Sequence, residues 1–263
     1  MKKEFNDYKD VSFLPIDLPY EKINLDELEV FHDRNYLWPP DVIEESYGGG
    51  AVKDAPYVEE HPHQIWRIVC LLGQLDDHEF SDPKAVRRSW VNRLERKQPV
   101  KINPALPKEL YGVIKLIEQL PIQCNHAELI RQRKNVAVHH DVSKLGADNH
   151  SQLIPFEPSG YRLLINDIRK PSFYFSEHKN DMPIEEHRTY LESHPEDKDY
   201  INLPMDTNTF VINELWHPHG ADKIDEQKFV VTTTGVIKPK EHIEVLNRSW
   251  EKYRDYAIQY SKE

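Results

Sequence analysis

The sequence predicts an α+β fold in which helices flank an antiparallel β core. Apolar residues recur at helical spacing within residues 84–120, whereas runs rich in β-branched and aromatic residues follow between residues 121 and 237. A further helical pattern closes the chain at 240–260. Because helices come first, then strands, then a last helix, their order indicates an α+β layout. A length of 263 residues suits one domain, 1–263.

The N-terminal part, residues 1–120, is expected to pack on this core. Its predicted elements are a strand at 11–19, a loop at 38–63, a helix at 84–96 and a helix at 107–120. Asp82-Pro83 and Pro107 supply the first-turn prolines that begin the two helices. The loop is rich in proline and glycine, so it is either a functional lid or a plain surface excursion.

The β core is expected over 121–238, followed by a C-terminal helix within 239–263. Five runs carry the strand pattern: 128–138, 161–167, 172–176, 209–213 and 229–237. A short helix is predicted between them at 183–193. The closing helix places Ile243, Leu246 and Trp250 along one side, as expected for a helix that packs on a sheet.

The charge balance argues against polyanionic partners. The chain has 34 basic and 45 acidic residues and a formal net charge of -11. A surface of that sign repels phosphate backbones and anionic lipid, so neither nucleic acid nor a membrane is expected as a partner. The basic cluster at 84–97 contains apolar residues at helical spacing, which indicates a solvated helix face.

The cysteines and the N-terminus predict a cytoplasmic protein. Cys70 and Cys124 both lie in apolar sequence surroundings, which predicts two free thiols and is typical of a reducing cytosol. The N-terminal segment has no apolar run, and no segment reaches the length that spans a bilayer.

The segment His139-His140-Asp141 is a candidate metal-binding motif. It follows the extended run 136–138, and residues two apart on a strand point to the same face. His139 and Asp141 can therefore bind one ion, while His140 points elsewhere. A chain with 14 histidines is expected to contain such a pair by chance, so the motif needs a third ligand.

Two histidines downstream, His217 and His219, can supply that ligand. Both follow the strand predicted at 209–213. Two histidines and one carboxylate on one triangular face leave three positions open, which suits iron(II) in oxygen-activating enzymes. A closed structural zinc site needs four nitrogen or sulfur ligands, and the cysteines are not placed to provide them.

Lys228 begins the last strand pattern and shares a face with Val230 and Thr232. If this face points inward, the lysine supplies a fixed cation that could anchor the far end of a dicarboxylate while the near end chelates iron. If it points outward, Lys228 is a solvated strand-start residue.

These residues resemble the iron(II)/2-oxoglutarate-dependent dioxygenases, whose signature is His-x-Asp, a distal histidine and then a basic residue. The segment 127–141 is more closely similar to the aspartyl/asparaginyl β-hydroxylase-like branch, which includes bacterial hydroxylases of free amino acids. The strands at 161–166, 172–175 and 229–235 also resemble that branch. The resemblance covers roughly residues 120–238.

The resemblance implies a double-stranded β-helix (jelly roll, cupin-like) core and three cofactors: Fe(II), 2-oxoglutarate as cosubstrate, and O₂. It assigns His139, Asp141 and His219 as the catalytic iron ligands. Lys228 would anchor 2-oxoglutarate, but this branch more often has arginine there, so Arg162 is the alternative anchor.

His217 remains an alternative to His219 as the distal ligand. His219 is preferred because His219-Gly-Ala-Asp222 resembles the turn that carries the family's distal histidine.

Three functions are compatible with these observations. The first is hydroxylation of an aliphatic C–H bond in a small-molecule substrate, an amino acid in particular. It is favoured by the modest chain length and the lack of a peptide-recognition repeat. The second is hydroxylation of Asp, Asn or another residue in a protein or peptide, with the loop at 38–63 as the cradle. The third is a jelly-roll protein that binds a metal or ligand without catalysis.

Overall fold

The structure is a computed structural model that describes residues 3–18, 67–82, 85–86, 89, 98–106, 108–132, 136–139, 155–156, 160–166, 168–177, 182–213, 217–226 and 228–260. The predicted loop at 38–63, most of the predicted helix at 84–96 and the predicted ligand Asp141 lie outside these residues.

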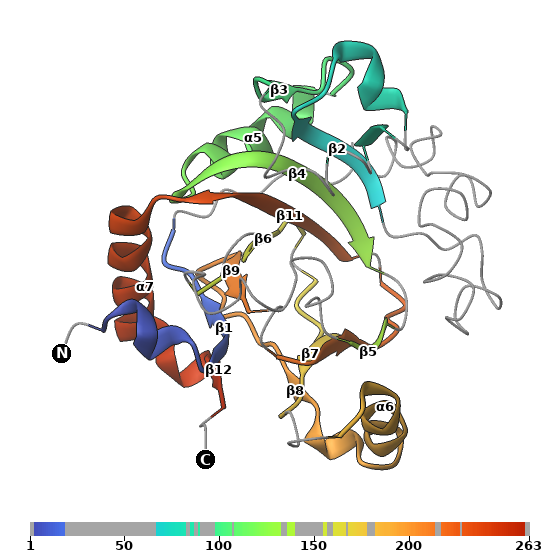
Figure 1. The fold of residues 1–263 in the computed structure, drawn as a ribbon, viewed down its shortest axis with the longest axis vertical. Helices are drawn as coiled ribbons and strands as arrows, with labels where there is room; N and C mark the ends of the chain where they lie inside the picture. The colour runs from blue at the N-terminus through green and yellow to red at the C-terminus, as the bar shows by residue number, and fades with distance from the viewer. Residues whose placement is uncertain are drawn as a thin grey trace.

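Two antiparallel sheets form the body of the molecule (Figure 1). The strands of the larger sheet are β1 (Val11–Pro15), β2 (Arg67–Gly73), β3 (Lys101–Ile102), β4 (Ile122–Gln132), β6 (Tyr161–Leu164), β9 (Thr209–Ile212), β11 (Lys228–Ile237) and β12 (Ile258–Gln259). Those of the smaller sheet are β5 (Val136–His139), β7 (Phe173–Phe175), β8 (Asp199–Tyr200) and β10 (His219–Ala221).

The strand orders are β12-β1-β9-β6-β11-β4-β2-β3 in the larger sheet and β5-β10-β7-β8 in the smaller. From β4 to β11 the chain passes repeatedly between them, with β7 and β8 as consecutive strands of the smaller sheet. β4, β6, β9 and β11 lie in the larger sheet, whereas β5, β7, β8 and β10 lie in the smaller. The pairings recorded among the described strands are all antiparallel.

Helices cover the outer faces of the two sheets. They are α5 (Tyr111–Glu118), α6 (Ile184–Ser193) and α7 (Pro239–Tyr253), with short 3-10 turns at η1 (Phe5–Tyr8), η2 (Asp77–Ser81), η3 (Lys108–Leu110), η6 (Pro195–Asp197) and η7 (Arg254–Tyr256). Leu163 and Val231 of the larger sheet share one apolar cluster with Ile117 of α5 and Leu246 of α7. In Figure 1, α5 and α7 lie outside the larger sheet, and α6 lies beside the smaller one.

The inner face of the larger sheet packs against the smaller sheet. Leu164 and Val230 are cross-strand partners on β6 and β11, and both belong to an apolar cluster with Phe175 of β7. Their neighbours Leu163 and Val231 point the other way, toward the helices. The two-residue period therefore identifies which side chains of β6 and β11 face the interior between the sheets.

Most predicted elements are confirmed. Strands occur within the runs expected at 11–19, 161–167, 172–176, 209–213 and 229–237. The helix expected at 107–120 begins with η3 and continues as α5, and α6 matches the helix expected at 183–193. Cys70 and Cys124 are free cysteines, as predicted.

The predicted end of the last helix, at residue 260, is wrong. The α7 helix ends at Tyr253, and the chain turns through η7 before Ile258–Gln259 pairs with β1. Two interactions explain the change. The backbone N–H of Tyr260 donates to the carbonyl oxygen of Asp10 at 2.9 Å, and Ile258 packs into the cluster between the sheets.

The predicted boundary of the β core at residue 121 does not match the larger sheet. β1, β2 and β3 precede that residue and belong to the same sheet, as does β12 near the C-terminus. β2 pairs along β4, which begins at Ile122, six residues before the extended run predicted at 128. Residues 122–127 lack a clear strand pattern of their own, and they become part of β4 because they pair with β2 and β11.

Candidate metal centre

His139 and His219 lie side by side on the inner surface of the smaller sheet. They are cross-strand partners in the antiparallel pair of β5 and β10, and their ring centroids are 4.4 Å apart. Directly opposite residues in such a pair point to the same face. The two imidazoles are therefore placed to share one ion, although they are 80 residues apart in sequence.

The hydrogen bonding of His219 determines its tautomer. Its Nδ1 lies 3.1 Å from the carbonyl oxygen of His217. A carbonyl oxygen only accepts, so Nδ1 carries the proton and donates. The lone pair is then on Nε2, the arrangement found in metal-binding histidines whose other nitrogen is held by an outer partner.

Aromatic side chains surround His219. The ring of Phe173 stacks against it at a centroid distance of 5.5 Å, and Phe175 lies 6.0 Å away on the same strand. His219 is 3% exposed. This apolar wall limits the access of water and fixes the ring, so a bound ion would meet the histidine in one orientation.

His217 makes different contacts. Its Nε2 lies 3.4 Å from the carbonyl oxygen of Lys9, and its ring lies 5.5 Å from that of Tyr260. It precedes β10, and its own carbonyl orients His219. The prediction that His219-Gly-Ala-Asp222 forms a turn is wrong, because residues 219–221 form β10 and pair with both β5 and β7.

Asp141 lies outside the described residues, two positions beyond His139, the last residue of β5. Within the part of the chain that the structure describes, no group of three or more histidine, cysteine, aspartate or glutamate side chains could hold a metal ion. Two of the three predicted ligands, His139 and His219, are therefore described.

Lys228 is buried, so the alternative in which its side chain faces solvent is wrong. It begins β11 and is 4% exposed. Its Nζ donates to the carbonyl oxygen of Lys170 and to the hydroxyl of Ser172, both at 3.3 Å. Burial lowers the pKa of Lys228 to about 8, because a charged ammonium is poorly solvated there. A carboxylate bound beside Lys228 would stabilise the charged ammonium and raise this pKa again.

Arg162 also faces the interior between the sheets. It is the cross-strand partner of Thr232 on β11 and lies two residues from the inward-facing Leu164. The side chain is 9% exposed, and its Nη1 donates to the carbonyl oxygen of Tyr161 at 3.2 Å. Lys228 and Arg162 are thus two buried cations whose strands are neighbours in the larger sheet.

His126 and Glu128 are two polar residues on β4 that were not among the predicted site residues. Glu128 is the partner of Thr232 and His126 is the partner of Thr234, so both share the face of Arg162. Each is 1% exposed. The signal was present in the sequence, since two ionisable residues two apart in an apolar strand mark one polar face.

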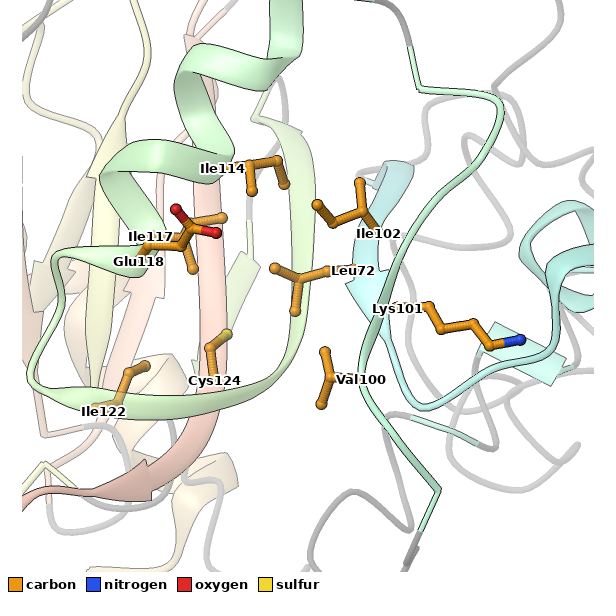
Figure 2. A pocket seen from close by; sticks show the side chains of 9 residues that line it. All are labelled: Leu72, Val100, Lys101, Ile102, Ile114, Ile117, Glu118, Ile122 and Cys124. Atoms are coloured by element: carbon orange, nitrogen blue, oxygen red, sulfur yellow. The ribbon is translucent and has the colours of Figure 1, made fainter.

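A separate cavity of about 380 Å³ lies on the outer side of the larger sheet, between α5, β3 and β4 (Figure 2). Nine residues line it: Leu72, Val100, Lys101, Ile102, Ile114, Ile117, Glu118, Ile122 and Cys124. Burial raises the pKa of the Cys124 thiol to about 12, so this cysteine is a poor nucleophile. None of the predicted site residues lines this cavity.

Comparisons with known proteins give solved structures only. No family model matches the chain, and no curated protein matches it. AviO1 from Streptomyces viridochromogenes Tue57 is 12% identical, with a TM-score of 0.37, and the match covers 88% of this chain and 92% of AviO1. HygX from Streptomyces hygroscopicus, solved with nickel and 2-oxoglutarate bound, is 14% identical, with a TM-score of 0.38 and coverages of 90% and 87%.

A third match is an oxidoreductase of the 2OG-Fe(II) oxygenase family from Burkholderia pseudomallei. It is 10% identical, with a TM-score of 0.35, and the match covers 90% of this chain and 95% of that one. Among the described residues, no helix has the length and apolar character needed to cross a membrane.

Proposed function

We propose that this chain is an iron(II)- and 2-oxoglutarate-dependent dioxygenase that hydroxylates an aliphatic C–H bond of a free amino acid or a related small molecule. The observation that carries the proposal is the pairing of His139 with His219 across β5 and β10. The bond from His219 Nδ1 to the carbonyl of His217 puts the ring's lone pair on Nε2, the nitrogen that would bind the metal.

The strand order supports a double-stranded β-helix. From β4 to β11 the chain passes repeatedly between the two sheets, and β11 returns to lie between β4 and β6. This interleaving places β5 beside β10, far apart in sequence. The proposed fold thereby explains why the first histidine of the His-x-Asp segment meets a histidine near the C-terminal end of the core.

His139, Asp141 and His219 would hold the iron, which leaves three coordination positions for cosubstrate and oxygen. With 2-oxoglutarate and O₂, the bound iron supplies the oxidising power for C–H hydroxylation, and the coproducts are succinate and CO₂. Lys228 would bind the distal carboxylate of 2-oxoglutarate, since among the described residues its buried ammonium donates to the Lys170 carbonyl and the Ser172 hydroxyl and to no carboxylate.

The proposal is tested by anaerobic addition of Fe(II) and 2-oxoglutarate to the purified protein. Chelation of iron by 2-oxoglutarate is expected to give a weak visible charge-transfer band, and its absence would contradict the assignment. Succinate release would then be measured across free amino acids and peptides. If succinate is released only in the presence of peptides, the substrate is a residue in a polypeptide and not a free amino acid.

A further inference from the structure

The connection between β6 and β7 contacts the first two residues of β11. The backbone N–H of Ile165 donates to the carbonyl oxygen of Phe229 at 3.0 Å, and the side-chain oxygen of Asn166 accepts the backbone N–H of Phe229 at 2.9 Å. Farther along, the same connection reaches the side chain of Lys228, the residue before Phe229. One connection therefore fixes both the backbone and the cationic side chain at the start of β11.

The two acceptors that hold the Lys228 ammonium in the described part of the chain belong to this connection. They are the carbonyl oxygen of Lys170 and the hydroxyl of Ser172, each 3.3 Å from Nζ. Lys170 contributes only its backbone here, because its own ammonium is exposed and pairs with Glu226. Both distances are long for a hydrogen bond, so a small displacement of the connection would move the acceptors out of reach.

Arg169 fastens residues 168–172, which we call the anchor segment, to the loop 203–207. Its Nη1 faces three backbone carbonyl oxygens of that loop. They are those of Pro204 at 2.6 Å, Thr207 at 3.1 Å and Leu203 at 3.3 Å. This nitrogen has two N–H groups, so at least one of them is shared between two oxygens. A charged donor forms stronger hydrogen bonds than a neutral one, so the anchor segment and the loop are expected to move as one unit.

The loop 203–207 is itself bound to the body of the larger sheet. The hydroxyl of Thr207 donates at 2.6 Å to the carbonyl oxygen of Ile16, directly after β1, and both residues are fully buried. Asp206 also pairs with Lys252 of α7 at 3.0 Å, but both side chains are largely exposed, and an exposed ion pair contributes little. The buried bond to Ile16 is thus the firmer attachment, and Arg169 extends it to the anchor segment.

We propose that Arg169 is a positioning residue of the cosubstrate site. By fixing the anchor segment, it keeps the Lys170 carbonyl and the Ser172 hydroxyl where they hold the Lys228 ammonium for the distal carboxylate of 2-oxoglutarate. A lysine side chain that is already ordered loses less rotamer freedom when its ligand binds, and this raises the affinity. The inference rests on the proposed function and adds to it a residue that acts through Lys228.

The test is anaerobic titration of the Fe(II)-loaded protein with 2-oxoglutarate, followed by the visible band. Arg169→Met keeps a long, unbranched side chain and removes its donors. It is expected to raise the dissociation constant of 2-oxoglutarate by about tenfold, as for the loss of one hydrogen bond to a charged group. The iron content should not change, because β5 and β10 fix His139 and His219. Unchanged affinity for 2-oxoglutarate would overturn the inference.

A double-mutant cycle separates positioning from direct binding. If Arg169 acts through Lys228, Arg169→Met introduced into Lys228→Met should change the affinity for 2-oxoglutarate by less than about twofold. If Arg169 binds the cosubstrate itself, the losses of the two single variants multiply, and the positioning role is overturned. A general loss of stability would not depend in this way on the presence of Lys228.

Arg169→Lys is the conservative variant. Its ammonium carries three N–H groups for the three carbonyl oxygens of the loop 203–207, so the affinity should stay within about threefold of the native value. Arg254→Met, at an exposed position after α7, is the matched control and should bind as the native protein does. If Arg169→Met does not fold, Ser172→Ala removes one acceptor of Lys228 directly, and unchanged affinity in that variant would equally overturn the inference.

Amide hydrogen exchange tests the anchor segment without metal or cosubstrate. The backbone N–H of Asp222 donates to the carbonyl oxygen of Ser172 at 2.8 Å. In Arg169→Met this amide should exchange at least about tenfold faster, because the anchor segment is less firmly held. The amide of Asn103, which donates to the carbonyl of Leu71 beyond β3 at the edge of the larger sheet, should not change. Equal exchange of the Asp222 amide in both proteins would overturn the inference.

The visible band of the iron–2-oxoglutarate complex separates the two proposals. If the native protein lacks the band, the proposed function fails. If the native protein shows the band and Arg169→Met binds 2-oxoglutarate as tightly as the native protein does, the inference alone fails. Far-ultraviolet circular dichroism of each variant excludes misfolding as the cause of lost binding.

Discussion

His139 and His219 face each other across β5 and β10 with their ring centroids 4.4 Å apart, while the carbonyl of His217 holds Nδ1 of His219. The backbone just before β10 thus orients the side chain of His219, which lies on β10. His217 lies two residues before that histidine in the chain, but its ring contacts Tyr260 and the carbonyl oxygen of Lys9 instead. This division of roles between two neighbouring histidines leads to the first prediction.

His139→Ala and His219→Ala are each expected to weaken iron(II) binding by more than about 100-fold. Loss of a side chain that only hydrogen-bonds to a metal ligand weakens binding by up to about 100-fold, and loss of the ligand itself should weaken it further. The measurement is metal content after anaerobic equilibration and desalting. His217→Ala removes the neighbouring imidazole but keeps the backbone carbonyl, so it should retain iron. Loss of iron in His217→Ala with retention in His219→Ala would reverse the assignment of the distal ligand.

Lys228→Met is expected to raise the dissociation constant of 2-oxoglutarate by about 10- to 100-fold, because a charge-assisted hydrogen bond is lost. Lys170→Met is the matched control. Its ammonium is exposed and pairs with Glu226, so affinity should not change. Anaerobic titration followed by the visible band measures both. Unchanged affinity in Lys228→Met combined with a large loss in Arg162→Gln would make Arg162 the anchor.

The affinity for 2-oxoglutarate is also expected to depend on pH. The pKa of Lys228 is lowered to about 8 by burial, so the ammonium is present below that pH and is lost above it. Affinity should therefore fall as the pH rises through about 8, and binding of the dianion should raise the pKa of the lysine. Lys228→Arg should remove this dependence, since arginine stays charged. A pH-independent affinity in the native protein would contradict the role of Lys228.

The buried His242 is expected to make the folded state less stable in acid. Burial lowers its pKa from 6.5 to about 4, with its ring held between the Tyr161 hydroxyl and the Pro155 carbonyl. As the pH falls from about 6.5 to about 4, the unfolded chain binds a proton that the folded chain does not. Folding stability should fall by about 3 kcal/mol across this window from His242 alone.

Urea unfolding at several pH values tests this prediction. His242→Gln is expected to be less stable than the native protein near neutral pH but to lose less stability as the pH falls. Parallel curves for the two proteins would show that His242 does not contribute to the acid sensitivity.

Gly235 allows the close approach of β11 to β4. A Cβ built there would lie 2.2 Å from the carbonyl oxygen of Gln123 and 2.8 Å from Cα of Cys124, beside the irregular register between Thr234 and Gly235. Gly235→Ala should therefore destabilise the fold by about 1–3 kcal/mol, because backbone atoms must move. Gly112→Ala in α5 has no atom within 4 Å and should stabilise it by about 0.5–1 kcal/mol. If Gly235→Ala and Gly112→Ala changed the thermal unfolding temperature equally, the close approach of β11 to β4 at Gly235 would be contradicted.

Local sequence patterns predicted much of the fold. Runs of β-branched and aromatic residues marked β6, β7, β9 and β11, and helical spacing marked α5 and α6. These patterns record the side-chain period of one element at a time. The prediction failed for β10 and for the early part of β4, because both are extended through pairing with strands that are distant in sequence.

The sequence by itself determined which chemical groups are available: histidines at 139, 217 and 219, a lysine at 228 and an arginine at 162. Only the tertiary structure decided that His219 lies beside His139, that Lys228 is buried, and that Glu128 shares a face with Arg162. The physical reason is that strand alternation defines two faces but not which is the inner one. That choice depends on register and packing between segments far apart in the chain.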